Sequence, residues 1–518
     1  MNISRIHLKN FQSIKDSCSL KLSPITFFYG QNSVGKSAVF DAMNAMNELC
    51  KVSNEHQKLS KNIHMYNPDL IMTIGAGFIT SKRLYTWRDI YECHSLFYHD
   101  LDILSNSAEV DIYFNVNTVD LVNVEIKINN QEYAYYDNNK SSLEINLSHP
   151  EIIEIDNYLT QNYNKSFVDL CQIVSNKNII TNNNIILHGI YEDGFLCSNV
   201  MIEQWESSLD SGDLLILNTT LSYILLAPID YYMHIFEHNI KQIGPLRKIP
   251  DLMDLYFYQN KQGNIVNSNF HEDSNWYNGS KAWVNLVKNN KRKVSYCNGE
   301  RKEENINLID YINNWLSSPD KLDMAYTIAR KRSIISYEKV ETIGDIFEND
   351  IDDQYHPSAL VELRLQSIIK NGESLAVDLN NVGAGLSQII PILVSGLVAN
   401  QIFIEQPELH LHPKLQTDLG DYFIDRFNNH NVHSVIETHS EYLALRILRR
   451  IREFHDEDFK SDDNFKLSKD DVMFYYFDSD GTKTTVTELK VDKDGDFIDR
   501  WPKGFFSERE RELFDEDF

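Results

Sequence analysis

The first fifty residues predict three strands, a loop and a helix from the spacing of their apolar side chains. Residues 3–8 alternate between apolar and polar side chains, as a half-buried strand does, and residues 20–22 suit a second short strand. Residues 25–29 are almost continuously apolar, which is typical of a strand buried on both faces. Residues 30–37 then form a loop, and apolar side chains at helical spacing predict a helix over residues 38–49.

The middle of the chain has a different composition and a mixed pattern. Between residues 81 and 239 Asn, Tyr and Asp become frequent, residues 110–136 alternate like antiparallel strands, and residues 156–171 are spaced like a helix. We interpret this region as an insertion, part sheet and part helix, built onto a nucleotide-binding core. Further along, a helix is expected over residues 308–316 and strands within residues 362–379, around an Asn-Gly turn.

The pattern of a buried α/β core returns in residues 382–440, with a loop, a helix over residues 389–398, a strand, a helix and a strand. Beyond residue 453 the chain is acidic, and two strand-like runs flank Asp480-Gly481, which is a hairpin signal. We therefore predict an α/β fold in five segments: the N-terminal part of the core (1–80), the insertion (81–240), a middle part returning to the core (241–380), the C-terminal half of the core (381–452), and an acidic hairpin and tail (453–518).

Composition and charge narrow the classes of partner. Of the 518 residues 42% are hydrophobic and 24% are charged, close to the average of globular proteins. With 49 Lys and Arg against 76 Asp and Glu, the formal net charge is -27. A chain this acidic is not a general polycation for DNA or anionic lipid, so any contact with nucleic acid must come from a local basic patch.

Membrane segments and disulfides are not expected. The chain has no apolar run of about 18 residues, and its N-terminus lacks the pattern of a signal peptide. The six cysteines are scattered without a C-x-x-C pair, which argues against a zinc site and against a disulfide framework. We therefore expect a cytoplasmic protein without a membrane partner.

One loop carries a specific chemical pattern, because residues 30–37, GQNSVGKS, match the phosphate-loop motif G-x-x-x-x-G-K-[ST]. Two glycines let the backbone wrap a phosphate closely, so that successive N–H groups point at it. Lys36 places a cation on the β- and γ-phosphates, and Ser37 offers a hydroxyl to Mg²⁺ at the start of a helix. A chance glycine-rich turn is the weaker interpretation, since a buried strand precedes the loop and a helix follows it. ATP and Mg²⁺ are therefore the predicted cofactors, and the predicted nucleotide-binding residues are Gly30, Asn32, Ser33, Gly35, Lys36, Ser37 and Ala38.

A phosphate loop needs a carboxylate that holds the metal ion. The apolar strand over residues 402–405 ends in Glu405, which makes Glu405 the candidate magnesium ligand beside Ser37. A second short strand, residues 432–436, is followed by Glu437-Thr438-His439-Ser440. In open α/β folds such strand ends meet at the sheet edge where ligands bind. We therefore expect the acid and the histidine to lie at one edge.

Two further polar patterns have competing interpretations. Gly383, Gly385 and Ser387 at a helix start could form a second anion-binding turn, or Ser387 could simply cap the helix. A single chain with one phosphate loop has no use for a second cradle in the same site, whereas two copies docked head to tail do. His410 and His412, spaced by two beside a proline, favour a structural role over a metal site.

These segments, in this order, resemble the ABC-type ATPases of the SMC, RecF and overcoming-lysogenisation-defect class. Within that class, they resemble a bacterial subfamily that is associated with phage defence. Residues 6–14, IHLKNFQSI, resemble the opening strand of that class, Asn32 is typical of its phosphate loop, and residues 494–506 resemble the tail of an uncharacterised bacterial subfamily. The resemblance implies an ATPase head with a mixed-sheet core, an antiparallel β lobe and an α+β insertion. It also implies roles in the site: Glu405 as the Walker B acid, His439 as the switch histidine at the γ-phosphate, and Gly383, Gly385 and Ser387 as the signature turn that contacts the nucleotide of a second protomer.

One position departs from the pattern of this class. Its members usually carry a catalytic glutamate directly after the Walker B acid, and Gln406 stands there in this chain. A glutamine cannot act as a general base at neutral pH. Either hydrolysis is slow and the ATP-bound dimer is long-lived, which we favour, or another acid such as Glu408 or Glu437 polarises the water.

The resemblance also raises the question of a nuclease, because members of this class often carry a nuclease domain after the switch histidine. About eighty residues follow His439, and they hold no glutamate with a D-x-D pair on alternating strands and helices. Asp478 and Asp480 fall on the predicted hairpin and suit turn chemistry better. We therefore expect no nuclease domain in this chain and no long coiled coil.

Three functions remain in competition. The first is an ATP-dependent switch, a homodimer or larger homo-oligomer that controls a separate effector protein, such as a nuclease or toxin, in bacterial defence against phage. The second is a DNA-repair or DNA-structure-binding ATPase, for which three basic clusters, residues 291–293, 330–332 and 446–452, could supply a DNA path. The third is a scaffold that binds ATP without hydrolysing it.

Overall fold

The computed structural model describes most of the 518-residue chain. The described residues are 2–50, 71–79, 108–116, 121–140, 142–174, 180–181, 184–188, 190–192, 200–202, 210–248, 256–259, 265–267, 275–288, 293–297, 303–334, 359–368, 374–377, 384–456 and 465–499.

Two compact units make up the chain. The first unit comprises Met1–Leu22, Gly30–Ile240 and Phe477–Thr487, and the second comprises Ser23–Tyr29, Lys241–Tyr476 and Glu488–Phe518. Each unit is therefore assembled from segments that are far apart in the sequence.

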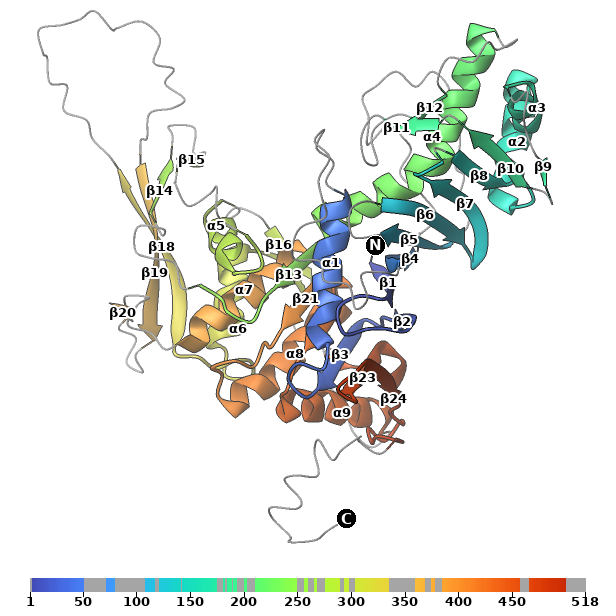
Figure 1. The fold of residues 1–518 in the computed structure, drawn as a ribbon. Coiled ribbons are helices and arrows are strands. Elements are labelled where there is room, and N and C mark those ends of the chain that lie inside the picture. Colours follow the sequence, from blue (N-terminus) through green and yellow to red (C-terminus); the bar gives the residue numbers. More distant parts are fainter. Residues whose placement is uncertain are drawn as a thin grey trace, which may run out of the picture. The chain divides into compact units, whose positions relative to one another are not determined.

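A nine-stranded antiparallel sheet forms the centre of the first unit, with the strand order β2-β1-β4-β5-β6-β7-β8-β10-β9 (Figure 1). Alternate side chains of β5 and β6, such as Ile112, Phe114, Val124 and Ile126, are fully buried. The antiparallel strands predicted over residues 110–136 are therefore confirmed. The strands are β1 (Ile3–Lys9), β2 (Cys18–Lys21), β4 (Met72–Ile79), β5 (Glu109–Val116), β6 (Leu121–Ile128), β7 (Gln131–Asp137), β8 (Ser142–Asn146), β9 (Ile180–Thr181) and β10 (Asn184–His188).

The longest helix of this unit was not predicted from the sequence. It is α4 (Ser211–His234), which continues into a π-helical turn at Ile235–Asn239 and packs Tyr232 against Phe78 and Phe114 of the sheet. Pro228 lies inside it. The helix carries apolar side chains almost all round, so its sequence lacks the one-sided pattern that identifies a surface helix. Among the helices in the described part of the chain, none is long and apolar enough to span a membrane.

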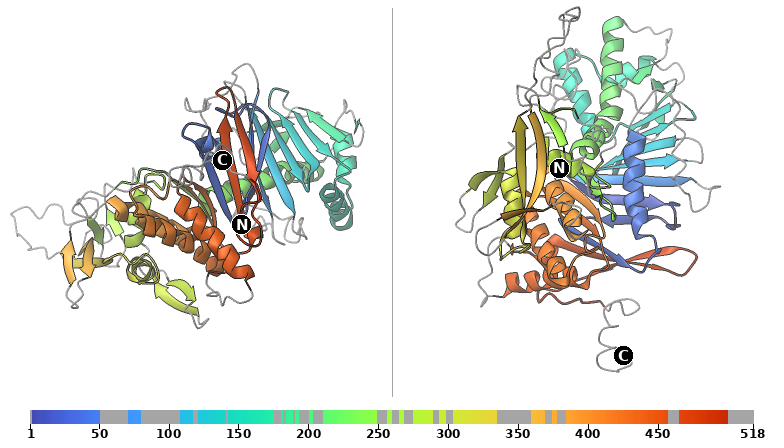
Figure 2. Two further views of the ribbon diagram at one scale, coloured as in Figure 1. Left: turned by 90° about the horizontal axis from the view of Figure 1, so that it is seen from below. Right: turned by 90° about the vertical axis from the view of Figure 1, so that its left-hand side faces the viewer.

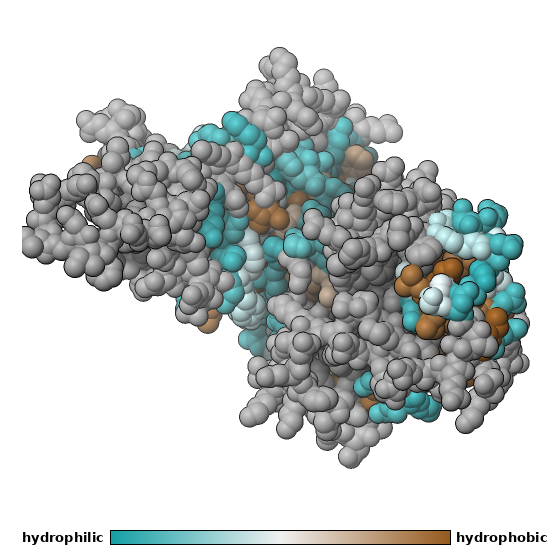
Figure 3. All heavy atoms as spheres, turned by 90° about the horizontal axis from the view of Figure 1, so that it is seen from above, coloured by the Kyte–Doolittle hydropathy of each residue, from teal (hydrophilic) through white to brown (hydrophobic). Residues whose placement is uncertain are grey.

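The helix predicted over residues 156–171 is in fact two helices, α2 (Pro150–Tyr163) and α3 (Phe167–Val174). Asn164 ends α2 in the left-handed conformation, with φ of 56°, and its N–H donates back to the carbonyls of the last turn. The Asp156 carboxylate then accepts the N–H of Phe167, at 2.6 Å, and so holds the start of α3. Ile153 of α2 and Ile173 of α3 are exposed. Figure 3 shows that apolar side chains lie among hydrophilic ones on one face of the molecule.

The remaining elements of the first unit are α1 (Lys36–Cys50), which follows the phosphate loop, and a small hairpin of β11 (Ile190–Glu192) and β12 (Val200–Ile202). The helix predicted over residues 38–49 is confirmed in α1, although the helix begins two residues earlier.

The parallel strands of the second unit belong to a six-stranded sheet with the order β13-β21-β22-β3-β23-β24, in which residues 477–487 are counted with the first unit. Figure 2 shows the ribbon in two further views, with the C-terminal strands in red. The strands β21, β22 and β3 run parallel, and β23 and β24 form the hairpin predicted around Asp480-Gly481, so the sheet is mixed. The strands are β3 (Ile25–Gly30), β13 (Ile240–Ile243), β21 (Gln401–Glu405), β22 (His433–Glu437), β23 (Val472–Ser479) and β24 (Thr484–Leu489). We call β23 and β24 together, residues 472–489, the C-terminal hairpin.

A shared core holds the helices of this unit, including Trp283, Trp315, Tyr311 and the apolar side chains of one central helix. The α/β order predicted for residues 382–440 is confirmed, and so is the helix predicted over residues 308–316. The helices are α5 (Ser280–Lys288), α6 (Leu308–Ser317), α7 (Ala384–Val398), α8 (Pro413–His430) and α9 (Glu441–His455), and the short 3-10 helix Lys469–Asp471 precedes β23.

An antiparallel sheet completes the second unit, with the order β15-β14-β19-β18 and β20 paired to β19. The α/β fold, with a mixed sheet and a separate antiparallel lobe, is therefore confirmed. These strands, with a further hairpin of β16 and β17, are β14 (Tyr256–Gln259), β15 (Ile265–Asn267), β16 (Lys293–Cys297), β17 (Glu303–Asn307), β18 (Tyr326–Ile334), β19 (Ala359–Ile368) and β20 (Ser374–Val377).

Candidate functional site

The phosphate loop starts at Gly30, the last residue of β3, and runs into α1 (Figure 1). Gly30 has φ of 146° and Gly35 has φ of 100°, which favour glycine. There is also no room for a side chain, because a Cβ on Gly30 would lie 2.3 Å from the carbonyl oxygen of Phe477, and one on Gly35 would lie 2.2 Å from Ser13 Oγ. Both glycines of the motif are therefore required by conformation and by space.

Lys36 is buried inside its own loop. Its Nζ donates to the carbonyl oxygens of Gly30, at 2.9 Å, and Gln31, at 2.7 Å, and the residue is 3% exposed. Ser37, in the first turn of α1, is exposed, and Ala38 beside it is buried. The remaining predicted loop residues, both exposed, are Asn32 and Ser33. A buried ammonium group facing a ring of backbone groups, with an exposed hydroxyl next to it, suits the binding of a polyphosphate and its metal ion.

Two side chains that were not predicted as site residues support the loop from behind. The Thr484 hydroxyl, on the first residue of β24, donates to the carbonyl oxygen of Val34 at 2.7 Å and lies 2.8 Å from Ser13 Oγ. The N–H of Thr484 donates to the carbonyl oxygen of Ser13 at 2.9 Å. Ser13 stands in the run of residues that resembles the opening strand of the ATPase class, but no sequence signal pointed to Thr484.

The candidate carboxylates lie at one edge of the parallel strands. In the register of the sheet Glu405 of β21 is aligned with Glu437 of β22, and Glu437 is aligned with Phe28 of β3. Parallel strands end on the same side, so the acids stand at the carboxyl-terminal edge, where ligands bind in open α/β sheets. Glu405 and Glu437 are both buried. The predicted placement of Glu405 at the end of a buried strand is confirmed.

Gln406, the residue in the place of the usual catalytic glutamate, turns the chain sharply away from the sheet. Its φ is 45°, a left-handed conformation that is uncommon for a residue with a side chain. Its N–H donates to the carbonyl oxygen of Glu437 at 2.7 Å, so the parallel pairing continues one residue beyond the strand. Uncommon backbone conformations persist only where the surrounding structure holds them, and they cluster at functional sites.

Glu408 binds the segment that carries His439. One of its carboxylate oxygens accepts the N–H of His439 at 2.7 Å, and the other accepts the hydroxyl of Thr438 at 2.7 Å. Burial raises the pKa of Glu408, and the hydrogen bonds from His439 and Thr438 oppose that rise. The geometry therefore gives Glu408 a role in positioning residues 438–439.

The start of α9 fixes the same segment from the other side. The Ser440 hydroxyl accepts the N–H of Leu443 at 3.2 Å and caps the helix, and it bonds Gln416 Oε1 at 2.6 Å. The Tyr29 hydroxyl donates to the carbonyl oxygen of Ser440 at 3.2 Å. His439 is thus held between a strand end and a capped helix, and it is only partly buried.

Arg247 is a further residue of this edge that the sequence did not single out. It is 5% exposed, and its guanidinium group donates to Gln388 Oε1 at 2.8 Å and to the carbonyl oxygen of Glu405 at 2.9 Å. Burial lowers the pKa of Arg247 to about 10, while the charges of Glu408 and Glu405 act in the opposite direction. Arg247 therefore joins the start of α7 to the end of β21.

The glycine-serine turn lies partly inside α7, because this helix begins at Ala384 and not at residue 389 as predicted. Gly385 lies within its first turn, where a Cβ would be 3.2 Å from the carbonyl oxygen of His410. The Ser387 hydroxyl donates to the carbonyl oxygen of Ala384 at 2.7 Å, and Ser387 is buried. The segment is helical and not a loop, because the apolar residues that follow it pack into the core. Gly383 lies outside the described residues.

The paired histidines have the structural role that their pattern favoured, at least at one position. His412 is the N-cap of α8, where its Nδ1 accepts the N–H of Lys414 at 3.3 Å. His410 has φ of 60° and is exposed in the turn before the helix.

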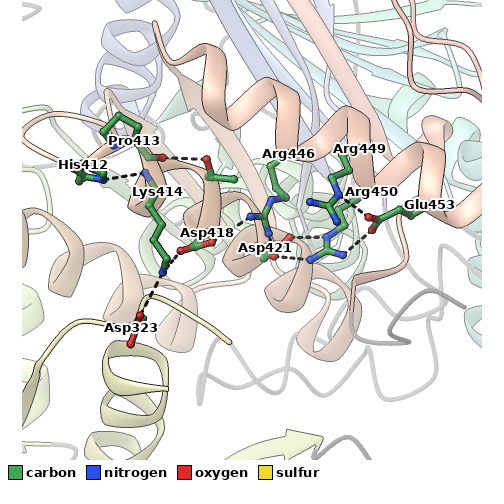
Figure 4. A network of polar contacts seen from close by, with 11 residues as sticks. Asp323, His412, Pro413, Lys414, Asp418, Asp421, Arg446, Arg449, Arg450 and Glu453 are labelled. Carbon is green, nitrogen blue, oxygen red and sulfur yellow. Dashed lines mark hydrogen bonds and ion pairs between the residues drawn. The ribbon is translucent and has the colours of Figure 1, made fainter. Parts of the chain in front are cut away.

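The basic cluster at residues 446–452 is a network of ion pairs between α8 and α9 (Figure 4). The carboxylate of Asp421 pairs with Arg446 and, at 2.9 and 2.7 Å, with Arg450. Glu453 pairs with Arg449 at 2.6 Å and Arg450 at 2.7 Å. These arginines are therefore already neutralised within the chain. Of the other two clusters only Lys293 has a described side chain, and it is exposed.

The acids of the C-terminal hairpin form a turn. Asp480 Oδ1 accepts the hydroxyl of Thr482 at 2.6 Å and the N–H groups of Thr482 and Lys483 at 2.8 and 2.9 Å. These bonds lower the pKa of Asp480 to about 2. Asp480 therefore performs the turn chemistry that was expected of it.

Each group of predicted residues is thus brought together within one unit. The loop residues Gly30, Lys36 and Ser37 belong to the first unit. The residues Glu405, Gln406, Glu408 and His439 belong to the second unit, at the edge formed by β21 and β22.

Two family models match parts of this chain. A family model described as an AAA ATPase domain matches residues 1–444. A second model, described as a protein of unknown function, matches residues 467–515, which include the tail motif at residues 494–506. No curated protein matches the chain.

Three of the solved structures that match this chain are heads of SMC proteins. The head of an Smc protein bound to the C-terminal winged-helix domain of ScpA covers 95% of this chain and 99% of that chain, at 10% identity and a TM-score of 0.38. An Smc head with an extended coiled coil, in a complex derived from Pyrococcus furiosus, covers 94% and 96%, at 9% identity and a TM-score of 0.35. The SMC head domain from Thermotoga maritima covers 95% and 100%, at 8% identity and a TM-score of 0.36.

Proposed function

This chain belongs to the AAA ATPase domain family, and on that premise we propose that it is a slowly hydrolysing, ATP-driven switch that works as a dimer. The observation that carries the proposal is the phosphate loop, in which the buried Lys36 ammonium group faces the carbonyl oxygens of Gly30 and Gln31. A buried cation is costly unless it is paired. Bound phosphates would replace those two carbonyl contacts with stronger charge-assisted hydrogen bonds.

The residues present fit ATP and Mg²⁺. The N–H groups of residues 30–38 would surround the phosphates, and Lys36 would neutralise the β- and γ-phosphates. The exposed Ser37 hydroxyl and the Glu405 carboxylate are the proposed ligands of Mg²⁺. When bound, this ion would withdraw charge from the phosphates. His439, held by Glu408, is the proposed contact to the γ-phosphate.

Slow hydrolysis is expected from Gln406, the first residue after β21. Gln406 has no carboxylate, and Glu408, the next acid along the chain, already accepts two hydrogen bonds from residues 438 and 439. A general base must lie within hydrogen-bond reach of the proton that it abstracts, and both carboxylate oxygens of Glu408 face residues 438 and 439. An ATP-bound state that persists is the expected result.

Dimerisation would bring the turn at residues 383–387 of one copy to the nucleotide of the other. Ala384 is exposed and Gly385 is half-buried, so backbone N–H groups are accessible at the start of α7. The Ser387 hydroxyl is bonded to Ala384, so the backbone of the turn and Gly385 supply the proposed contact.

The decisive experiment compares ATP binding and molecular mass for the wild type, Lys36→Ala and a control, Lys9→Ala, at an exposed strand end. Loss of the phosphate-binding cation should weaken ATP binding about 10- to 100-fold and abolish the ATP-dependent rise in mass measured by light scattering. Lys9→Ala should behave as the wild type. Wild-type protein that binds no ATP, or binds it without any change in mass, contradicts the proposal.

The biological role that we propose for the switch is control of a separate effector, such as a nuclease or toxin, in a bacterial anti-phage system in the cytoplasm. The resemblance to the overcoming-lysogenisation-defect class supports this role. The ion pairs of residues 446–452 leave fewer free cations for the alternative of DNA binding. Expression of a neighbouring gene with and without this one tests the role, because a guarded effector should be toxic only alone. Copurification of the effector should depend on Lys36.

A further inference from the structure

Three segments distant in sequence meet behind the phosphate loop. They are the turn after β1 with Ser13, the loop residues Val34 and Gly35, and the C-terminal hairpin with Thr484. Ser13, Val34, Gly35 and Thr484 all belong to the first unit, which includes residues 477–487 of the hairpin. Thr484 is 8% exposed, so these contacts are shielded from solvent.

The hydroxyl groups form a directed chain of hydrogen bonds. Thr484 donates its only hydroxyl hydrogen to the carbonyl oxygen of Val34, so Ser13 Oγ, 2.8 Å away, donates to Thr484 in turn. Gly35 leaves room for this pair, since a Cβ there would lie 2.2 Å from Ser13 Oγ and 2.7 Å from Thr484 Oγ1. The second glycine of the phosphate-loop motif therefore serves the hydroxyl pair as well as the phosphate.

We propose that the C-terminal hairpin is part of the nucleotide site, and that Thr484, with Ser13, is a positioning residue that holds the phosphate loop in the conformation that binds ATP. The inference rests on the proposed function. It assigns a task to a segment inside residues 467–515, which match a family of unknown function. Thr484 touches no phosphate in this arrangement and acts through the carbonyl of Val34, which precedes Gly35 and Lys36.

The energetic reason is the orientation of one peptide unit. With the Val34 carbonyl bonded to Thr484, the peptide N–H that follows points to the opposite side, because carbonyl and N–H are antiparallel in a trans peptide. That N–H belongs to Gly35, one of the groups expected to face the phosphates. Without the Thr484 hydroxyl, the Val34 carbonyl loses its hydrogen-bond donor and the phosphate loop gains conformational freedom. ATP binding must then order the loop at a cost in free energy.

Additional contacts keep the hairpin against the turn after β1. Phe477 of β23 occupies the space beside Gly30, where a Cβ would lie 2.3 Å from its carbonyl oxygen. Lys483 pairs with Asp16 at 2.8 Å in an exposed position. Both ends of the phosphate loop thus rest on the C-terminal hairpin.

The test compares Thr484→Val, which keeps the shape and removes the hydroxyl, with Thr484→Ser, which keeps the hydroxyl. Thr485→Val is the matched control, because Thr485 is the exposed neighbour on the same strand. ATP affinity is measured by titration with a fluorescent ATP analogue, turnover by phosphate release, and folding by the melting temperature. Ser13→Ala and the double variant with Thr484→Val complete a mutant cycle.

Thr484→Val should weaken ATP binding about five- to tenfold and raise KM more than it lowers kcat, whereas Thr484→Ser and Thr485→Val should bind as the wild type does. The fold-loss of ATP affinity in the double variant should be smaller than the product of the fold-losses in the two single variants, because the two hydroxyl groups belong to one chain of hydrogen bonds. If Thr484→Val fails to fold, Ser13→Ala alone tests the same chain.

Equal affinity for Thr484→Val and Thr485→Val overturns the inference, and so does a loss in Thr484→Ser as large as that in Thr484→Val. Neither outcome contradicts the proposed function as long as the wild type binds ATP and Lys36→Ala binds it about 10- to 100-fold more weakly. Conversely, a wild type without ATP binding overturns the proposed function first.

Discussion

The carboxylate of Glu408 accepts the backbone N–H of His439 at 2.7 Å, a hydrogen bond across 31 residues of sequence. The bond links the turn after β21 to the segment after β22 and leaves the histidine in a fixed place. Glu408→Ala removes the acceptor of this N–H and of the Thr438 hydroxyl, so we expect a loss of about 1 to 2 kcal/mol in the free energy of unfolding. Chemical denaturation measures that loss.

The conservative change separates positioning from base catalysis. Glu408→Gln keeps an oxygen that can accept the His439 N–H, but the amide cannot act as a base. The variant also removes the buried carboxyl group of Glu408, whose pKa is raised by burial. A positioning residue should therefore keep most of its ATP turnover as glutamine and lose it as alanine. Loss of turnover in Glu408→Gln, with unchanged stability and ATP affinity, would assign Glu408 as the base.

Gln406 is the expected limit on hydrolysis. Restoring the carboxylate with Gln406→Glu should raise ATP turnover at least about tenfold, because a positioned general base contributes that much or more. Phosphate release under saturating ATP is the measurement. The double variant Lys36→Ala with Gln406→Glu should be inactive, which excludes a contaminating ATPase. A rate no higher than that of the wild type would count against Gln406 as the limiting residue.

His433, the first residue of β22, makes stability sensitive to mild acid. Burial lowers the pKa of His433 from 6.5 to about 4, and its ring packs edge-on against Phe427. The folded protein keeps the imidazole neutral, whereas the unfolded chain takes up a proton near pH 6.5. The stability present above pH 6.5 is therefore lost as the pH falls towards 4, by up to about 3 kcal/mol.

The matched variant for this prediction is His433→Gln, which cannot titrate. Denaturation curves are measured at about pH 7.5, 6, 5 and 4.5, which span the titration of His433. As the pH falls, the free energy of unfolding should decrease more in the wild type than in the variant. An equal decrease of the free energy of unfolding in both proteins would show that His433 does not cause the acid sensitivity.

In the arginine network of α8 and α9, the buried carboxylate of Asp421 should contribute more to stability than the exposed ion pair of Arg452 with Asp496. Asp421→Asn removes the buried carboxylate that Arg446 and Arg450 share and leaves them only Asp418 and Glu453, and we expect a loss of about 3 kcal/mol in the free energy of unfolding. Asp496→Asn is the control, because its pair with Arg452 is exposed and should contribute less than about 0.5 kcal/mol. Thermal unfolding of both variants measures the contrast, and equal losses would refute it.

Much of the site could be predicted because it depends on residues that are close in sequence. The phosphate loop is one run of eight residues between a strand and a helix, and Glu405 ends a strand that is apolar throughout. The turn at residues 383–387 was placed less well. Its glycines indicated a loop, but Gly385 and Ser387 lie in the first turn of α7, where the burial of the following apolar residues outweighs the local preference.

Residues that act from a distance escaped prediction altogether. Arg247 reaches Glu405 across 158 residues, and Thr484 reaches Val34 across 450 residues. Neither stands in a motif of its own. The long helix α4 was missed for a different reason, since it is apolar on nearly every side and shows no periodic contrast.

The sequence by itself determined the α/β class, the phosphate loop and the acid at the end of β21, because backbone wrapping, strand burial and helix starts depend on neighbours along the chain. Only the tertiary structure decided which groups support these residues: Glu408 beneath His439, Arg247 beside Glu405, and Thr484 behind Val34. Each of those contacts is one hydrogen bond between groups whose proximity is created by the packing of whole sheets. Since many pairs of polar residues could form such a bond, the chain alone contains no signal that selects the right one.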